Sequence, residues 1–173
     1  MPSSYQGPRS ANAASERTFS QSVASNTNTE TGRVHHLLAN KDGAPITITA
    51  DETLSAAVTV LRDKRIGALI VVDAAGTLAG ILSERDIVRK LAETPGQTLP
   101  QTVAENMTRT VTTCGPSDTL IEVLRRMTEG RFRHMPVVEN GAIRGMVTIG
   151  DVVGYRLNEL EHEALQLKQL IVG

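Results

Sequence analysis

Hydrophobic residues along the chain alternate between a helical spacing and short continuous runs, and this order occurs twice. Two helices are predicted where apolar residues recur every three or four positions, at Leu54, Ala57, Val58 and Leu61 and again at Leu120, Val123, Leu124 and Met127. Each helix is followed by a run rich in β-branched residues, 68–73 and 135–139. These runs are too continuous for one face to meet water, so we expect buried strands.

Each buried strand is expected to return as a hairpin, because turn residues follow it. The turns are Asp73-Ala-Ala-Gly76 and Glu139-Asn-Gly141, and the returning strands are 78–82 and 143–147. A second helix begins after Ser83 in the first copy and after Thr148 in the second. A short extended piece precedes the first helix of each copy, at 46–48 and at 111–113.

The two copies align as an internal repeat, which is a strong indication of architecture. Residues 46–90 superpose on residues 112–155, and matched positions include Arg65 with Arg131, Gly80 with Gly145, and Asp86 with Asp151. Each unit of roughly 50–60 residues is too small to be stable alone. We therefore expect an α/β fold in which two tandem β-α-β-β-α repeats share one core.

The chain divides into four parts. We expect a disordered tail over 1–32, the first repeat over 33–94, the second repeat over 95–160, and the end of a long C-terminal helix over 161–173. The tail holds too few large apolar side chains to offset the entropy of ordering it. A transit peptide is the alternative there, although Glu16 and Glu30 disfavour it. Short apolar stretches, 34–38 and 103–107, are each expected to close their own repeat.

The last helix carries a heptad-like seam. Its apolar residues alternate spacings of three and four and are Leu157, Leu160, Ala164, Leu167 and Ile171. Such a seam packs either on the chain's own core or against a second copy. Fewer than three heptads leave both alternatives open.

Composition excludes several classes of protein. The 173 residues carry a net charge of −1 and are 40% hydrophobic but only 2% aromatic, with no Trp. This charge argues against a nucleic-acid binder. The longest strongly apolar stretch, 66–72, is far shorter than the about 20 residues of a membrane span. The single cysteine forms no internal disulfide, and no charged-then-apolar leader opens the chain. We expect a cytoplasmic protein that does not bind membranes.

Patterns typical of catalysis or metal binding are missing from the sequence. The histidines are His35, His36, His134 and His162, and they lack the spacing of zinc ligands. Cys114 has no neighbouring base, and neither a phosphate loop nor a dinucleotide glycine fingerprint occurs. We therefore expect a binding module with no metal and no catalytic residues.

A hydroxyl residue followed three positions later by an acid opens the second helix of both copies. The two motifs are Ser83-Glu-Arg-Asp86 and Thr148-Ile-Gly-Asp151. Such a pair caps a helix, which is the structural alternative to a ligand site. A helix N-terminus at a cleft also attracts anions, and Arg85 would add a positive charge in the first copy only.

A cluster of hydrogen-bond donors precedes the buried strand of the second copy. Arg131, Arg133 and His134 fit a phosphate clamp, because the planar guanidinium group pairs bidentately with phosphate. A solvated corner between helix and strand is the alternative. The first copy keeps only Arg65 and has Gly67-Ala68 at the matching positions. We expect unequal half-sites, with phosphate held mainly by the second copy.

Four segments together resemble the strands and helix starts of a pair of CBS domains, the family named for cystathionine β-synthase. They are Ile66-Gly-Ala-Leu-Ile-Val-Val-Asp, Gly80-Ile-Leu-Ser-Glu-Arg-Asp-Ile, Arg131-Phe-Arg-His-Met-Pro-Val-Val and Gly145-Met-Val-Thr-Ile-Gly-Asp-Val-Val. The resemblance covers about residues 33 to 155 and suggests a stand-alone pair. It implies that the two repeats are related by pseudo-twofold symmetry around a central cleft, which commonly binds AMP, ADP, ATP, NAD or S-adenosylmethionine. It assigns Asp86 and Asp151 to the ribose hydroxyls, and Ser83 and Thr148 to ribose or phosphate.

An adenine ring needs a flat apolar slot, and this chain offers few aromatic rings. With two Phe, two Tyr and no Trp, we expect aliphatic walls. The candidates, which fit a core equally well, are Ile46, Ile48, Ile81, Val111 and Met146. Gly67 and Ala68 would let a base approach the backbone closely.

We expect a regulatory module that senses an adenine nucleotide and transmits its occupancy as a conformational change. Its partners would be a second copy, in a homodimer, and an unidentified downstream protein. A ligand-independent interaction module, in which the two motifs are only helix caps, is the alternative. Nucleic-acid binding through Arg62, Lys64, Arg65, Arg131 and Arg133 is a third and weaker hypothesis.

Overall fold

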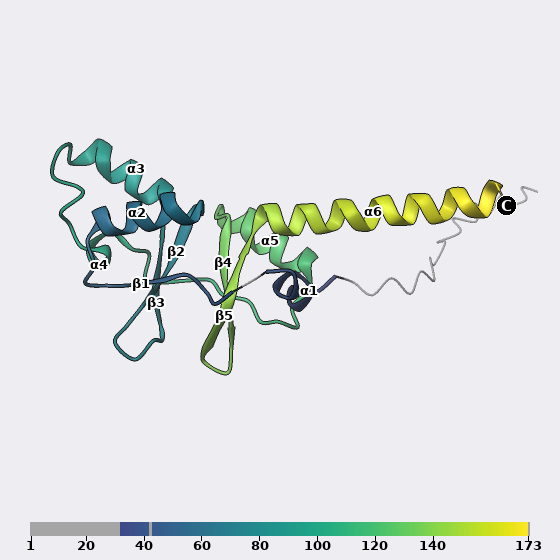
Figure 1. Cartoon of the computed structure of the whole chain (residues 1–173), viewed down its shortest axis with the longest axis horizontal. Coiled ribbons are helices and arrows are strands. Elements are labelled where there is room, and N and C mark those ends of the chain that lie inside the picture. The colour runs from purple at the N-terminus through teal and green to yellow at the C-terminus, as the bar shows by residue number, and fades with distance from the viewer. Residues whose placement is uncertain (1–31, 42, 173) are drawn as a thin grey trace, which may run out of the picture.

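The structure, a computed structural model, describes residues 32–172 except Asp42 (Figure 1). The tail expected over residues 1–32 therefore lies outside the described residues, apart from Gly32. Gly32 is buried, and its carbonyl accepts a hydrogen bond from the Leu120 amide at 2.9 Å. Gly32 thus belongs to the packed structure, one residue before the expected boundary.

The elements of the described chain follow the order expected of two repeats. They are α1 (Val34–Ala39), β1 (Thr47–Thr49), α2 (Leu54–Lys64), β2 (Ala68–Val72), β3 (Leu78–Ser83), α3 (Glu84–Glu93), α4 (Val103–Asn106), α5 (Leu120–Gly130), β4 (His134–Glu139), β5 (Ala142–Thr148) and α6 (Ile149–Val172). In the first repeat β1 pairs in parallel with β2, and β3 pairs antiparallel on the other side of β2. Thr53 caps α2 by accepting a hydrogen bond from the Ala56 amide at 3.2 Å.

The second repeat lacks its predicted first strand. β4 and β5 form an antiparallel pair, but residues 111–113 form no strand, so that prediction was wrong. Only Cys114 pairs with β4, in a single parallel bridge to Val137.

Pro136 explains why the strand is lost. The Cys114 amide donates to the Pro136 carbonyl at 3.1 Å, and the Val138 amide donates to the Cys114 carbonyl at 2.9 Å. The next hydrogen bond of a parallel ladder would need an N–H group at residue 136. Proline has none, whereas the matching residue of the first repeat is Ile70.

The short helices α1 and α4 do not each close their own repeat as we expected. Val34 and Leu37 of α1 are buried in the core of the second repeat, while Val103 of α4 is buried in the core of the first. Backbone hydrogen bonds fix both helix starts. The Val34 amide donates to the Asp118 carbonyl at 3.0 Å, and the Val103 amide donates to the Glu52 carbonyl at 2.8 Å.

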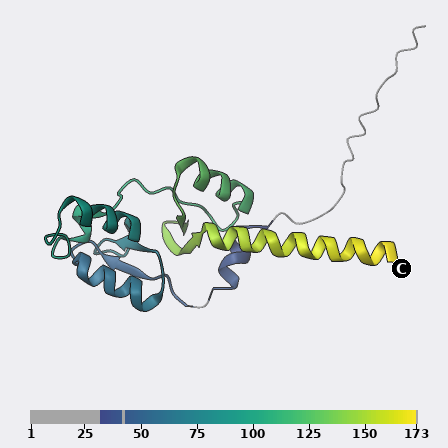
Figure 2. The ribbon, with the colours of Figure 1, turned by 90° about the horizontal axis from the view of Figure 1, so that it is seen from above.

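Each repeat has its own hydrophobic core, which corrects the expectation of one shared core. The fully buried residues include Leu54, Leu69 and Leu82 in the first core and Leu120, Met135 and Val147 in the second. Ile70, on the other face of β2, is also buried but belongs to neither core. The two units lie side by side along the long axis (Figure 1). Helix α6 passes between α5 and α1 and runs out beyond the second unit (Figure 2).

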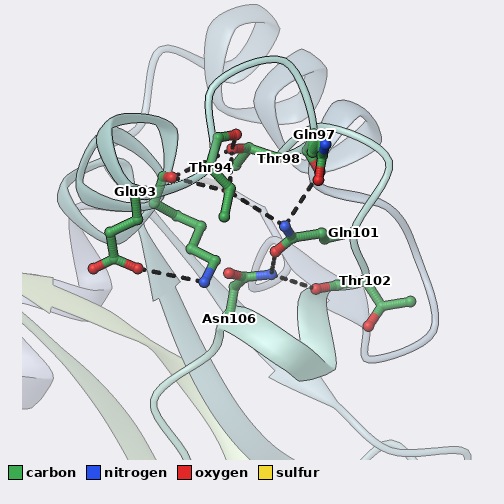
Figure 3. A network of polar contacts seen from close by, with 8 residues as sticks. Glu93, Thr94, Gln97, Thr98, Gln101, Thr102 and Asn106 are labelled. Atoms are coloured by element: carbon green, nitrogen blue, oxygen red, sulfur yellow. Dashed lines mark hydrogen bonds and ion pairs between the residues drawn. The ribbon is translucent and has the colours of Figure 1, made fainter.

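A polar network fastens the connection between the repeats (Figure 3). The buried Thr98 hydroxyl donates to the Thr94 carbonyl at 2.7 Å. The Gln101 side-chain amide donates to the Gln97 carbonyl at 3.2 Å, and the Asn106 amide donates to Gln101 Oε1 at 3.1 Å. The connection thus satisfies its polar groups internally and holds α4 against α3.

Matched glycines in β3 and β5 make room for the short helices. A Cβ atom at Gly80 would lie 2.7 Å from Met107 Sδ and 2.9 Å from the Thr108 carbonyl oxygen. A Cβ atom at Gly145 would meet only a methyl carbon of Leu38, at 2.8 Å. The first clash involves backbone, whereas the second involves the end of a flexible side chain.

We predict that Gly80→Ala lowers the free energy of unfolding by about 1–3 kcal/mol, because the added methyl group forces the backbone at Thr108 to move. The matched variant Gly145→Ala should lose less than about 1 kcal/mol, because Leu38 can change its rotamer. Urea denaturation measures both. Equal losses would contradict the close backbone packing at Gly80.

Candidate functional site

Two cavities lie between the repeats. The first cavity has a volume of about 350 Å³ and the second about 530 Å³, both in the range of small-molecule sites. Gly67 and His134 line both of them. These two residues therefore stand between the cavities, at the contact between the repeats.

Each cavity is built from both repeats in a crossed arrangement. Residues 83–86, the acid motif of the first repeat, line the first cavity together with residues 131–134 of the second repeat. Thr148 and Asp151, from the acid motif of the second repeat, line the second cavity together with residues 65–68 of the first. A ligand in either cavity therefore contacts both repeats.

Both acid motifs are helix caps that leave one carboxylate oxygen free. Asp86 Oδ2 accepts hydrogen bonds from Ser83 N at 3.0 Å and Ser83 Oγ at 2.6 Å. Asp151 Oδ2 accepts from Thr148 N at 2.8 Å, and the Asp151 amide donates back to Thr148 Oγ1 at 3.1 Å. Within residues 32–41 and 43–172, no hydrogen bond reaches Oδ1 of either aspartate. Helix capping and ligand binding are therefore compatible at these positions.

Lys41 holds the aspartate of the second cavity. Its Nζ donates to Asp151 Oδ2 at 2.6 Å and to the Met146 carbonyl at 2.8 Å. Burial raises the pKa of Asp151, but the hydrogen bonds from Lys41 and Thr148 outweigh it and hold the pKa below its ordinary value. No lysine or arginine of the described chain forms an ion pair with Asp86. A ligand would therefore meet Asp151 already paired with a lysine, but Asp86 without an ion pair.

Basic side chains surround the first cavity. Its arginines are Arg85, Arg89, Arg131 and Arg133. Arg85 Nη1 lies 3.5 Å from the Arg131 carbonyl, across the two repeats. Arg131 and its counterpart Arg65 end their helices in the left-handed conformation, with φ of 55° and 54°. Glycine is the usual residue there, so arginine at both positions accepts strain to place a positive charge beside each cavity.

His134 occupies the contact between the repeats. Its Nε2 would lie 3.2 Å from a Cβ atom at Gly67, so the ring rests against the backbone of the first repeat. Burial lowers the pKa of His134 below its ordinary value; Glu84 opposes this, and Arg133 adds to it. A neutral imidazole can both donate and accept hydrogen bonds.

The two cavities are lined by different apolar side chains. Those of the second cavity are Leu38, Pro45, Ile46, Ile66, Ile70 and Met146, whereas those of the first are Ile81, Val111 and Phe132. Among the aliphatic candidates from the sequence, Ile48 lines neither cavity. It is the buried residue of β1, between two exposed threonines, and packs in the core of the first repeat.

Several cavity residues carry no recognisable signal in the sequence. Lys41, Arg89 and Arg144 line the cavities but belong to no repeated motif. Phe132 lies inside the predicted basic cluster, and this position is the only sign in the sequence that it lines a cavity. It supplies an aromatic ring to a cavity for which the composition predicts aliphatic walls.

Other kinds of site find no support in the part of the chain that is described. Residues 32–41 and 43–172 hold no group of three or more His, Cys, Asp or Glu side chains placed to bind a metal ion. None of the helices described is long and apolar enough to cross a membrane. Cys114 is buried, and burial raises the pKa of its thiol to about 12, which disfavours a reactive thiolate.

Sequence comparison finds the same family in both repeats. The model of the CBS domain matches residues 40–93 and again residues 102–158. A mitochondrial CBS domain-containing protein of Arabidopsis thaliana, CBSX3, is 34% identical over 136 residues, which are 76% of this chain and 66% of that protein. A 33.4 kDa protein of Thermofilum pendens is 39% identical over 98 residues, 57% of this chain and 32% of that protein. The chain thus spans less than two thirds of the length of these relatives.

Solved structures share the fold. A CBS-domain containing protein from Agrobacterium tumefaciens superposes with a TM-score of 0.71 at 38% identity, covering 75% of this chain and 96% of that one. The CBS domain pair of protein MJ0100, solved with 5′-methylthioadenosine and S-adenosyl-L-methionine, superposes with a TM-score of 0.66 at 28% identity. That match covers 75% of this chain and 98% of the other.

We predict that the Lys41–Asp151 ion pair contributes stability at neutral pH that acid removes. The pKa of Asp151 is lower in the folded chain, so this stability is present above the ordinary value of 3.8 and is lost as the pH falls through the folded value. Because the pair is partly exposed, Lys41→Met should lower the free energy of unfolding by about 0.5–1 kcal/mol at pH 7 and by less at pH 3.

Urea denaturation at both pH values measures this difference. Lys64→Met is the matched control, since Lys64 is exposed and forms no ion pair with any described residue. Equal losses for Lys41→Met at pH 7 and pH 3 would contradict the role of the pair.

Proposed function

The chain belongs to the CBS-domain family, with two tandem repeats, and from this premise we propose that it is a regulatory module that binds an adenine nucleotide between them. The observation that carries the proposal is the crossed construction of the cavities. The acid motif of each repeat shares a cavity with the helix–strand corner of the other. A ligand bound there is held by both repeats at once.

The chemistry of the first cavity suits a nucleotide. Asp86 Oδ1 is available to accept hydrogen bonds from ribose hydroxyls, each contributing about 1.5–3 kcal/mol when charge-assisted. Arg131 and Arg133 line the same cavity from the other repeat and suit a phosphate group. Phe132 and Ile81 offer an apolar wall for the base.

The charge of the first cavity favours some adenine ligands over others. The domain pair of MJ0100 binds 5′-methylthioadenosine and S-adenosyl-L-methionine. S-adenosylmethionine carries a positive sulfonium centre, which the net positive lining of the first cavity, four arginines against Glu84 and Asp86, would repel. AMP, ADP, ATP and NAD carry phosphate groups, which the same arginines attract. We therefore place AMP and its relatives ahead of S-adenosylmethionine as the ligand of this chain.

The two cavities should differ in their affinity for a nucleotide. Asp86 is free of ion pairs, whereas Asp151 shares one carboxylate oxygen with Lys41. A nucleotide in the second cavity must accommodate this lysine, and in return gains a positive charge for its phosphate. The first cavity is therefore the primary site in this proposal.

Nucleotide occupancy becomes a conformational signal because one ligand bridges two repeats. It favours the relative orientation in which both half-sites meet it, and it shifts that equilibrium only by its difference in affinity for the two arrangements. Helix α6 carries Asp151 in its first turn, so it connects the second cavity to the far end of the molecule. The output would be a change in the position of α6 relative to the first repeat, which a partner protein could detect.

Two copies of the chain pair in this proposal, and the pair acts on a downstream protein. Exposed apolar residues on the helices support such contacts; they include Val58, Val88, Leu91, Ile121 and Val153. The proposed location is the cytoplasm. The Arabidopsis relative CBSX3 is named as a mitochondrial protein.

We predict that Asp86→Asn, in the primary site, weakens AMP binding about 10- to 150-fold, as expected for the loss of a charge-assisted hydrogen bond, and that Asp151→Asn weakens it less. Asparagine preserves the shape of the cap but turns a carboxylate into an amide. Isothermal titration calorimetry measures the affinity, and urea denaturation verifies that each variant is folded.

A third capping box provides the control. Glu105 Oε2 accepts hydrogen bonds from Thr102 N at 2.7 Å and Thr102 Oγ at 2.8 Å, but neither residue lines a cavity. Glu105→Gln should bind AMP as the unchanged chain does. If both aspartate variants also bind as tightly as the unchanged chain, the motifs are helix caps alone and the proposed site is wrong.

A further inference from the structure

The C-terminal part of α6 runs clear of both repeats (Figures 1 and 2). From Leu157 onward, one face of α6 carries large apolar side chains that are more than half exposed: Leu157 at 55%, Leu160 at 52%, Leu167 at 60% and Ile171 at 83%. Ala164, on the same face, is also exposed. A continuous apolar stripe of this kind marks an interaction surface.

The stripe has the spacing of a two-stranded coiled coil. Leu157, Ala164 and Ile171 occupy the a positions of a heptad, and Leu160 and Leu167 occupy the d positions. Leucine at both d positions, together with the β-branched Ile171 at an a position, is the combination that favours two strands in a parallel pair. The sequence left open whether this seam packs on the chain's own core or against a second copy. The apolar side chains of residues 157–171 lie in the core of neither repeat, so they do not pack on the chain's own core.

The residues that precede the described chain do not match this stripe. Their only sizeable apolar side chains are Met1, Tyr5, Phe19 and Val23, which follow no heptad spacing. A second copy of α6, in contrast, presents the same stripe and can interdigitate with it along its whole length.

Charges beside the seam select the orientation of that second copy. Glu163 occupies a g position and Lys168 the following e position. In a parallel pair, a g residue of one helix meets the following e residue of the other. Glu163 would thus meet the partner's Lys168, twice by symmetry. Within the described chain neither residue forms an ion pair of its own.

We propose that residues 157–171 bind the same segment of a second copy as a parallel two-stranded coiled coil, with a Glu163–Lys168 ion pair on each side. An antiparallel pair would instead bring Lys168 to the partner's Glu161, because e positions then meet e positions. The proposal rests on the exposed helix and its charges, and does not depend on nucleotide binding. It places both second repeats at the same end of the coiled coil.

Charge reversal in the full chain tests both the surface and the orientation. Lys168→Glu should weaken dimerisation about 5- to 30-fold at low salt, because two attractions become repulsions. Adding Glu163→Lys should restore it, whereas adding Glu161→Lys should not. Gln169→Glu changes the charge by one unit at a neighbouring f position, away from the seam, and should dimerise as the unchanged chain does. Sedimentation velocity over a concentration series measures all of these.

Three outcomes would overturn the proposal. Rescue by Glu161→Lys instead of Glu163→Lys would show an antiparallel pair. Unchanged dimerisation of Lys168→Glu would place the contact elsewhere on the repeats. A chain that stays monomeric at every concentration would show that another part of the chain or another protein covers the stripe. AMP affinity, measured on the same variants, should remain unchanged, which separates failure here from failure of the proposed function.

Discussion

The contact between Gly67 and the imidazole of His134 governs how the two repeats meet. With no side chain at Gly67, the ring of His134 can lie against the backbone of the first repeat, and a cavity opens on each side of this contact. The residues that match them in the repeat are Arg133 and Ala68. The contact therefore has no symmetric counterpart, and the two cavities on either side of it are lined by different charged and apolar side chains.

A second constraint is the small size of each repeat. A unit of this length buries too little apolar surface to be stable alone, and the short helices supply the missing part. Val34 and Leu37, which precede the first repeat in the chain, complete the core of the second. The chain therefore runs from the second core to the first and back, and the contacts between the repeats lie at the cavities that a ligand would bridge.

Most of the fold followed from local patterns, because those patterns reflect forces that act within a few residues. Continuous β-branched runs predicted β2 and β4, and the spacing of apolar residues predicted α2 and α5. The missing strand at 111–113 depends on Pro136, more than twenty residues away, which removes a hydrogen bond from the partner strand. Which core α1 packs against is likewise determined by contacts that are distant in the sequence, because a short apolar helix could cover either core.

The cavities were predictable where a motif repeats and not elsewhere. Asp86 and Asp151 stand out because their spacing to a hydroxyl residue occurs twice, and the structure places both in cavities. Lys41 reaches Asp151 across 110 positions of sequence and belongs to no pattern. Ile48 shows the opposite error: an apolar residue beside the cavities was assigned to them, although alternation along β1 directs it into the core.

The central claim is that one ligand holds both repeats and fixes their relative orientation. Spin labels on Thr59→Cys in α2 and Arg125→Cys in α5, both exposed positions, report the distance between repeats by pulsed electron paramagnetic resonance. The native Cys114 is buried and should not react. Saturating AMP should narrow the distance distribution, and this narrowing should disappear when Asp86→Asn and Asp151→Asn are combined. An unchanged distribution, while calorimetry shows AMP to be bound, would contradict the account.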